Sequence, residues 1–579
     1  MLNNIIESDH VHRLRSSASP TCRLPREVLQ QIFVVCAQTS FHMPKWSWVA
    51  NLTFVCSAWR QAALDCGKLW SFIDFSHPRW TNLSLYRSKS LPVSVRAIIN
   101  AMNQQLVFRT LHYAPKIRDI HIISSVYDIG PLMGALSNPN SSLESLTVNV
   151  LRPDNANSDL RYSKRFAFSL GAHLPSMLYL ELHRTPIGLV SPRYTNLRDL
   201  SLHHLPFSER PSRHEFLSLL ENFVMLERLT LVHAFPKNKA TGDGTPGRIV
   251  HLPKLLTISL TGSILELVNI LECVSMQPVG RIYCHVHKID DFKTNFWRFA
   301  KAIGAKFHAA VDESPLDALV IEVQEESKRF TDENSYNLDF RQALHIQALG
   351  ATTNTEPLLD LLIGPDPVHD EVVISALGSI WDALPLMNIH SLILQNLDVV
   401  AQKSWPRLLR CLPNLRIIEI IGHCPSGLIW ALLMNARSHS HLEHDDTSSL
   451  LLPVLEDIYL FNTDCHAGGF MVSSSNVNSY CDLDDSRFLE VVSAYLEDRH
   501  RCGVPLRSLS ISCCSNVTTD VLNEIKGHVP RLLWDYRGEL REDPGQLETG
   551  RHAIYRSHWP SAPPPQRHYH RLRTLMDLD

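Results

Sequence analysis

Residues 197–202 read Leu-Arg-Asp-Leu-Ser-Leu, and this block decides the fold because its form, L-x-x-L-x-L, returns along most of the chain. Its second half alternates apolar and polar residues, as a short strand with one buried face does. Blocks of this kind occupy residues 117–122, 143–148, 178–182, 197–202, 226–231, 255–260, 316–321, 389–394, 415–420, 455–460 and 506–511. The sequence therefore predicts a series of similar strands.

The spacing of the blocks indicates a repeat. Up to residue 260 consecutive blocks begin about 20 to 35 residues apart, close to the period of leucine-rich repeats. Several blocks follow a helical stretch, as at residues 215–225 and 406–413. A strand and a helix per unit, stacked side by side, bury one leucine core and line the inner face of a curved array with strands. We therefore expect an α/β fold in which a leucine-rich-repeat solenoid presents a concave binding surface.

The repeat pattern weakens in the second half of the chain. Residues 282–287 are expected to be a degenerate copy. Between residues 321 and 389 only two short strands, at 343–346 and 358–363, and an amphipathic helix at 371–384 are predicted. The number and boundaries of the repeats therefore stay open there and between residues 460 and 506.

The N-terminal stretch has a different pattern. Residues 24–36 read LPREVLQQIFVVC, and Pro25 and Glu27 suit the first turn of a helix with an apolar stripe. A second apolar helix is predicted over residues 48–64. Its expected buried row is Leu52, Val55, Cys56, Trp59 and Ala63.

These two helices carry a family resemblance. Leu-Pro-x-Glu-Val-Leu-x-x-Ile-Phe, then Val-Cys-x-x-Trp-Arg and then Leu-Trp, in this order, resembles the F-box. The segment between the helices, residues 42–48, is longer than in the shortest members of that family. The resemblance implies a small all-helical module that docks on the adaptor of a cullin-RING ubiquitin ligase, while the rest of the chain selects the target.

The resemblance also implies which residues dock on the adaptor. They are Leu24, Pro25, Val28, Leu29, Ile32, Phe33, Val55, Trp59 and Trp70. The sequence leaves open which of them face the adaptor and which face the core of the module. It also leaves open an alternative, a repeat scaffold without a ligase whose N-terminal helices only cap the array. Such a cap would bury Val28, Ile32 and Trp59 against the first repeat, whereas a docking module would leave an apolar patch free.

Composition narrows the functional classes. The chain has 579 residues, 44% of them apolar and 20% charged, as in globular proteins with a sizeable core. Its formal net charge is −4, so the composition shows no excess of positive charge that would indicate binding to nucleic acid or to an anionic membrane. Residues 1–21 lack a secretory apolar run, and no stretch reaches membrane-spanning length. The thirteen cysteines are dispersed and are expected to be reduced and buried. We therefore expect a cytoplasmic or nuclear protein.

No arrangement of residues predicts catalysis. His285 and His287 have a spacing compatible with a metal, but no second ligand pair lies nearby in sequence. The polar stretch 439–446 is better explained as a solvated insertion, and the glycines of residues 242–247 lack the Lys-Ser/Thr of a phosphate-binding loop. The sequence predicts no enzyme activity, no cofactor and no metal site.

Five segments follow from these patterns. They are a flexible N-terminal tail (1–20), the F-box (21–76), a connecting region (77–115), the solenoid (116–533) and a largely disordered C-terminal tail (534–579). By resemblance, the chain is a substrate-recognition subunit of an SCF-type ubiquitin ligase. Its expected partners are the adaptor and an unidentified target protein on the repeats, with no nucleic acid and no membrane.

Overall fold

The computed structural model describes the N-terminal module, most strands of a long sheet and the helices beside them. The described residues are 24–39, 45–75, 77–113, 117–124, 142–151, 176–185, 195–205, 207, 210–237, 248–277, 280–288, 292–308, 316–327, 340–350, 356–364, 370–397, 404–423, 425–440, 450–463, 465 and 488–535. Among them, no helix is both long and apolar enough to cross a membrane.

One 17-stranded sheet runs through the chain. Its strands are β1 (Phe72–Asp74), β2 (Val93–Ile99), β3 (Ile117–Ser124), β4 (Ser145–Val150), β5 (Tyr179–His183), β6 (Asp199–His203), β7 (Arg228–Val232), β9 (Thr257–Ser263), β11 (Arg281–Lys288), β12 (Leu316–Ser327), β13 (Phe340–Gly350), β14 (Leu359–Ile363), β15 (Ser391–Gln395), β16 (Ile417–Ile421), β17 (Asp457–Phe461), β18 (Ser508–Ser512) and β19 (Arg531–Trp534). Strands β8 (Val250–His251) and β10 (Val274–Ser275) form a separate parallel pair.

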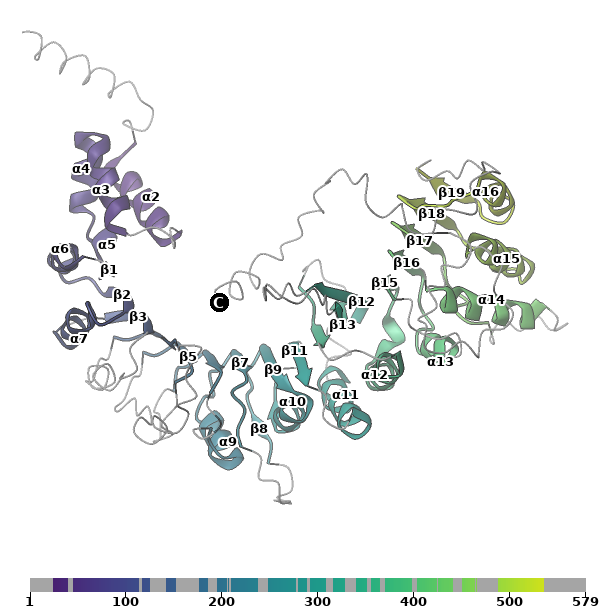
Figure 1. Cartoon of the computed structure of the whole chain (residues 1–579), viewed down its shortest axis with the longest axis horizontal. Coiled ribbons are helices and arrows are strands. Elements are labelled where there is room, and N and C mark those ends of the chain that lie inside the picture. Colours follow the sequence, from purple (N-terminus) through teal and green to yellow (C-terminus); the bar gives the residue numbers. More distant parts are fainter. Residues whose placement is uncertain are drawn as a thin grey trace, which may run out of the picture.

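Helices connect many of these strands and lie on one side of the sheet. After the N-terminal module they are α6 (Pro78–Ser88), α7 (Gln104–Tyr113), α9 (Arg213–Glu221), α10 (Ile264–Leu271), α11 (Phe292–His308), α12 (Asp370–Ala383), η3 (Leu386–Asn388), α13 (Trp405–Arg410), α14 (Ser426–Ser440), α15 (Phe488–Arg501) and α16 (Thr519–Lys526). Figure 1 shows an arc in which the strands line the inner side and these helices the outer side. The sheet therefore presents its other face to the inside of the arc.

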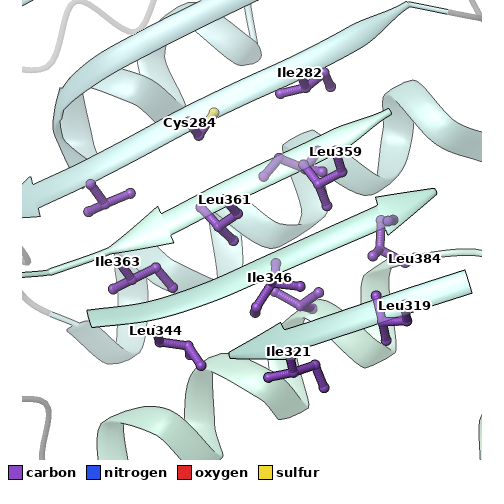
Figure 2. Close-up of a cluster of buried hydrophobic side chains, with 14 of the residues drawn as sticks. Ile282, Cys284, Leu319, Ile321, Leu344, Ile346, Leu359, Leu361, Ile363 and Leu384 are labelled. Carbon is purple, nitrogen blue, oxygen red and sulfur yellow. The ribbon is translucent and has the colours of Figure 1, made fainter. Parts of the chain in front are cut away.

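Parallel pairing follows chain order except in the middle of the sheet. From β1 to β11 each strand of the large sheet pairs with the next in parallel, and the same holds from β15 to β19. Between these arrays the spatial order is β11, β14, β13, β12, β15, and β13 is antiparallel to both of its neighbours. Figure 2 shows β13 running against the strands beside it. A three-stranded meander therefore joins two parallel arrays.

The leucines of the repeated blocks form the core. In β6 and β7, Leu200, Leu202, Leu229 and Leu231 are at most 1% exposed, and the residues between them point to the opposite face. Across the meander, Cys284, Leu361, Ile346 and Ile321 continue the same buried row toward the helices (Figure 2). Because alternate residues of a strand face opposite sides, the blocks also fix which residues face the inside of the arc.

Many strands end in the same way. The residue after the strand has a left-handed backbone, with φ between 49° and 55° at Arg184, His204, His233, Asn396, Asn462 and Cys513. In several of them the amide donates to a carbonyl of the neighbouring strand, as from His204 to Val232 at 2.6 Å and from Asn462 to Ser512 at 3.0 Å. The sequence analysis did not detect this turn, although asparagine tolerates the left-handed region better than most residues.

The predicted elements compare closely with the observed ones. Every predicted repeat block overlaps a strand of the large sheet. Residues 343–346 lie within β13, and residues 358–363 and 371–384 match β14 and α12 to within one residue at each end. Residues 77–115, expected to connect the module to the solenoid, contain α6, α7 and strand β2, which pairs with β3 of the large sheet. The predicted tail at 1–20 and nearly all of the tail at 534–579 lie outside the described residues.

Candidate functional site

The N-terminal module is all helical and has a core of its own. It consists of α2 (Arg26–Thr39), α3 (Lys45–Val55), α4 (Ser57–Asp65) and α5 (Gly67–Trp70). Leu29, Phe33, Leu52, Ala63 and Trp70 are among its buried residues, and this cluster is separate from the core of the sheet. The module therefore packs its apolar side chains on one another and on Trp80 and Leu83 of α6 rather than against the first strands.

The predicted single helix over residues 48–64 is two helices. Cys56 has an extended backbone with φ −159°, and it caps α4 because its Sγ accepts a hydrogen bond from the amide of Trp59 at 3.4 Å. The break changes the direction of the side chains before it. Val55, expected to be buried, is 57% exposed, while Leu52 and Ala63 are buried as expected.

Trp70 links the module to the sheet domain. Its indole nitrogen donates to the carbonyl of Ala63 at 2.8 Å, and its ring stacks on Trp80 of α6 at a centroid distance of 5.9 Å. The Arg87 guanidinium lies 5.2 Å from the same ring and donates to the carbonyl of Leu64 at 3.1 Å. Trp70 therefore supports the junction instead of offering an exposed surface.

Helix α2 has two apolar faces. Leu29, Phe33 and Ala37 point into the core of the module. Val28, Ile32 and Val35 follow one another at helical spacing on the outside, with exposed fractions of 38%, 41% and 57%. Large apolar side chains on a free surface indicate an interaction site when they cluster. We call these three residues the outer stripe of α2.

The predicted docking residues thus divide into two groups. Pro25, Val28, Ile32 and Val55 are exposed, Leu29, Phe33 and Trp70 are buried, and Leu24 and Trp59 are half-buried. Trp59 packs on Phe33 at a centroid distance of 5.1 Å. The sequence analysis omitted Val35 and Phe54, which are 57% and 76% exposed. Residues 28, 32 and 35 are separated by four and three positions, a helical spacing from which the exposure of Val35 beside Val28 and Ile32 could have been predicted. No comparable pattern in the sequence indicates Phe54.

The inner face of the sheet is the second candidate surface, and its chemistry changes along the arc. Toward the C-terminal end it exposes aromatic residues, Tyr459 and Phe461 of β17. Toward the N-terminal end it carries ionisable groups, and burial together with the charge of Arg96 lowers the pKa of His121. A partner bound along this face would therefore contact ionisable side chains toward the N-terminal end and aromatic side chains toward the C-terminal end.

Three ionisable residues of this face lie close together. Glu181 and His183 are on β5, and His203 lies beside His183 on β6, where the imidazole rings stack at 4.0 Å. One nitrogen or oxygen atom from each residue lies within 4.8 Å of the other two. The sequence analysis missed this group, although aligning residues 177–183 with 197–203 places the two histidines at equivalent positions.

The histidines considered from sequence lie elsewhere. His285 and His287 do share the inner face of β11, and His287 makes an edge contact with His233 at 4.4 Å. Neither belongs to the group that the described residues offer for a metal. The glycine stretch 242–247 and most of residues 439–446 lie outside the described residues.

Comparison with known proteins bears on the N-terminal module. No curated protein matches the chain in sequence. Residues 21–76 match the family described as F-box-like, so the helical module that carries the outer stripe of α2 is an F-box-like domain.

Proposed function

We propose that this chain is the non-catalytic substrate-recognition subunit of an SCF-type cullin-RING ubiquitin ligase. The F-box-like domain docks on the ligase adaptor, and the rest of the chain, a leucine-rich-repeat solenoid, binds the target on its inner face. A cytoplasmic or nuclear location accompanies this role.

The outer stripe of α2 is the observation that carries the proposal. A helical cap would bury Val28 and Ile32 against the first strands, but both side chains are exposed and the module packs on itself. Burying an apolar surface of this kind on a partner is favourable by roughly 25 cal/mol per Å². The exposed stripe therefore supports docking, and an F-box-like domain supports a ligase adaptor as the partner.

The sheet supports the second half of the proposal. Successive strands with leucines at equivalent buried positions, parallel pairing and helices on the outer side are the features of a leucine-rich-repeat array. The curvature of such arrays makes the concave, strand-lined side an extended binding surface. Here that side offers the ionisable groups of β5 and β6 and the aromatic side chains of β17.

The mechanism follows from holding two partners at once. One end of the chain binds the ligase and the other binds the target, so that encounters between target lysines and the charged conjugating enzyme become intramolecular. The effective concentration produced by such a link reaches the millimolar range when the geometry fits. No side chain of this protein needs to take part in the chemical step.

Binding of the full chain to the purified adaptor tests the proposal. We expect the parent to bind and the double variant Val28→Ala/Ile32→Ala to bind at least about 10-fold more weakly, because truncated apolar anchors lose about 2 kcal/mol. The matched control is Glu27→Ala/Gln31→Ala, two exposed polar positions of the same helix. It should bind as the parent does.

Two outcomes contradict the proposal in different ways. A parent chain that does not bind the adaptor excludes the ligase role and favours a repeat scaffold. Binding that survives Val28→Ala/Ile32→Ala excludes the outer stripe of α2 as the docking surface. Leu29→Ala is a poor test, because Leu29 is 3% exposed and its loss would damage the core of the module.

A further inference from the structure

We propose that Glu181, His183 and His203 form a binding site for one Zn²⁺ ion on the inner face of the sheet. The inference rests on the side chains of β5 and β6 and does not depend on the ligase role. No other group of three or more such side chains is close enough within the described residues.

The donor atoms of the three side chains lie close together. His183 Nε2 lies 2.8 Å from Glu181 Oε1, and His203 Nε2 lies 3.8 Å from the same oxygen. In a tetrahedral zinc site with bonds of about 2.0 to 2.2 Å, neighbouring donor atoms are separated by about 3.3 to 3.6 Å. The observed distances bracket this separation. The two rings stack parallel within 4°, so both must rotate before their in-plane lone pairs can point at one ion.

The strands hold these side chains rather than a flexible loop. His183 and His203 are cross-strand partners in the parallel ladder, and Glu181 precedes His183 by two residues, which places it on the same face. The donors are about four-fifths buried, with exposed side-chain fractions of 20% for His183, 18% for His203 and 21% for Glu181. The backbone therefore already places the three ligands side by side, and side-chain rotations complete the site.

A second layer of polar groups fixes the carboxylate. The Tyr179 hydroxyl donates to Glu181 Oε2 at 2.6 Å, and the Thr147 hydroxyl reaches the same oxygen at 3.3 Å. Both contacts fall on Oε2 and leave Oε1 to face the histidines. Hydrogen bonds that orient a ligand in this way are typical of protein metal sites and contribute to their affinity.

Zinc binds the deprotonated forms of carboxylate and imidazole ligands. Coordination would therefore replace the present hydrogen bond between His183 Nε2 and Glu181 Oε1, which is 2.8 Å long.

The ligand set indicates the ion and its coordination. Two imidazoles and one carboxylate favour zinc over the hard cations Mg²⁺ and Ca²⁺, which prefer oxygen ligands alone. Three protein ligands leave a fourth position of a tetrahedral ion open. Because the cluster lies on the inner face, that position points toward the inside of the arc, where water or a donor from a bound molecule completes the coordination.

Metal titration of the full chain tests the site. After removal of metals with a chelator, Zn²⁺ is titrated by calorimetry and Co²⁺ by visible absorption. We expect one equivalent of Zn²⁺ to bind at micromolar or lower concentration, and the Co²⁺ form to show the intense bands of a four-coordinate ion without thiolate charge transfer. His183→Ala/His203→Ala should weaken binding by more than about 100-fold, and Tyr179→Phe by about 10-fold.

Controls separate this site from the cysteines and from misfolding. His204→Asn changes the next residue along the chain, whose φ of 53° asparagine tolerates, and should leave Zn²⁺ binding unchanged. Circular dichroism checks that each variant is folded. Absence of Zn²⁺ binding by the parent, or a bound Co²⁺ whose spectrum shows thiolate charge transfer and survives His183→Ala/His203→Ala, overturns the proposal.

Discussion

Replacing His345 with glutamine is expected to destabilise the middle of the sheet in acid and to have little effect in mild base. His345 lies on β13, the antiparallel strand of the meander, and its side chain is 10% exposed. Its Nε2 is 2.9 Å from Asp360 Oδ1 on β14, and its Nδ1 is 3.4 Å from Glu322 Oε2 on β12. The protonated ring therefore ties β13 to both of its neighbours.

The pKa of His345 sets the size of the effect. Burial alone would lower this pKa, but the hydrogen bonds and charges of Asp360 and Glu322 raise it to about 9 from an ordinary value of 6.5. A group with a raised folded-state pKa stabilises fully below its unfolded pKa and loses that stabilisation as the pH rises through the folded value. The difference corresponds to about 3 kcal/mol near pH 6 and to less than about 0.5 kcal/mol near pH 9.

Urea unfolding of the parent and His345→Gln at about pH 6 and about pH 9 measures this contribution. The gap in unfolding free energy should shrink by about 2 to 3 kcal/mol between the two conditions. His390→Gln is the control, because His390 has a similar 2.9 Å contact with Asp317 but both side chains are more than 40% exposed. Exposed pairs contribute little, so no change above about 0.5 kcal/mol is expected. An equal loss at both pH values for His345→Gln would refute the charge argument and leave packing as the cause.

Two further predictions concern the helices on the outer side of the arc. Gly304→Ala in α11 should lower the unfolding free energy by about 1 to 3 kcal/mol, because the added Cβ would clash with the carbonyl oxygen of Ala383 in α12. Gly378→Ala in α12 should instead raise the unfolding free energy by about 0.5 to 1 kcal/mol, because no atom lies within 4 Å of the added Cβ. Arg499→Met should destabilise the chain by more than about 2 kcal/mol in thermal or urea unfolding, since the buried guanidinium donates to backbone carbonyls, that of Leu455 at 2.9 Å among them. Tyr495→Phe removes the 3.2 Å hydrogen bond between Arg499 and the Tyr495 hydroxyl and should destabilise the chain less than Arg499→Met does. The packing argument would be contradicted if Gly378→Ala were the more destabilising glycine variant. The hydrogen-bond argument would be contradicted if Tyr495→Phe were more destabilising than Arg499→Met.

The strands and the module could be predicted from the sequence for a clear physical reason. A strand with one buried face must alternate, so blocks such as residues 197–202 and 226–231 show both the element and its buried side. The F-box-like module was recognisable because its motifs occur in a fixed order over residues 21–76. Both signals are local in the chain.

The sequence pattern of α2 could not show which of its two apolar faces is buried and which is exposed. Val28 and Leu29 are equally apolar neighbours, yet one is 38% exposed and the other 3% exposed. A short helix that is apolar on both sides fits either orientation, and the packing of Leu29 and Phe33 in the core of the module decides between them. The same holds for Val55, which became exposed because the chain breaks at Cys56.

The order of the strands and the grouping of side chains also required the tertiary structure. A block of alternating residues states that a strand is half-buried but not which strand lies beside it, or in which direction. The meander of β12, β13 and β14 is therefore invisible in the local pattern, as is the contact of His345 with two carboxylates from different strands. Glu181 and His183 lie on β5 and His203 lies on β6, and only the register of β5 against β6 brings their donor atoms together. The sequence by itself determined the strands and their buried faces because alternation is local; the neighbours across the sheet, and with them the candidate site, were decided by pairing between distant segments.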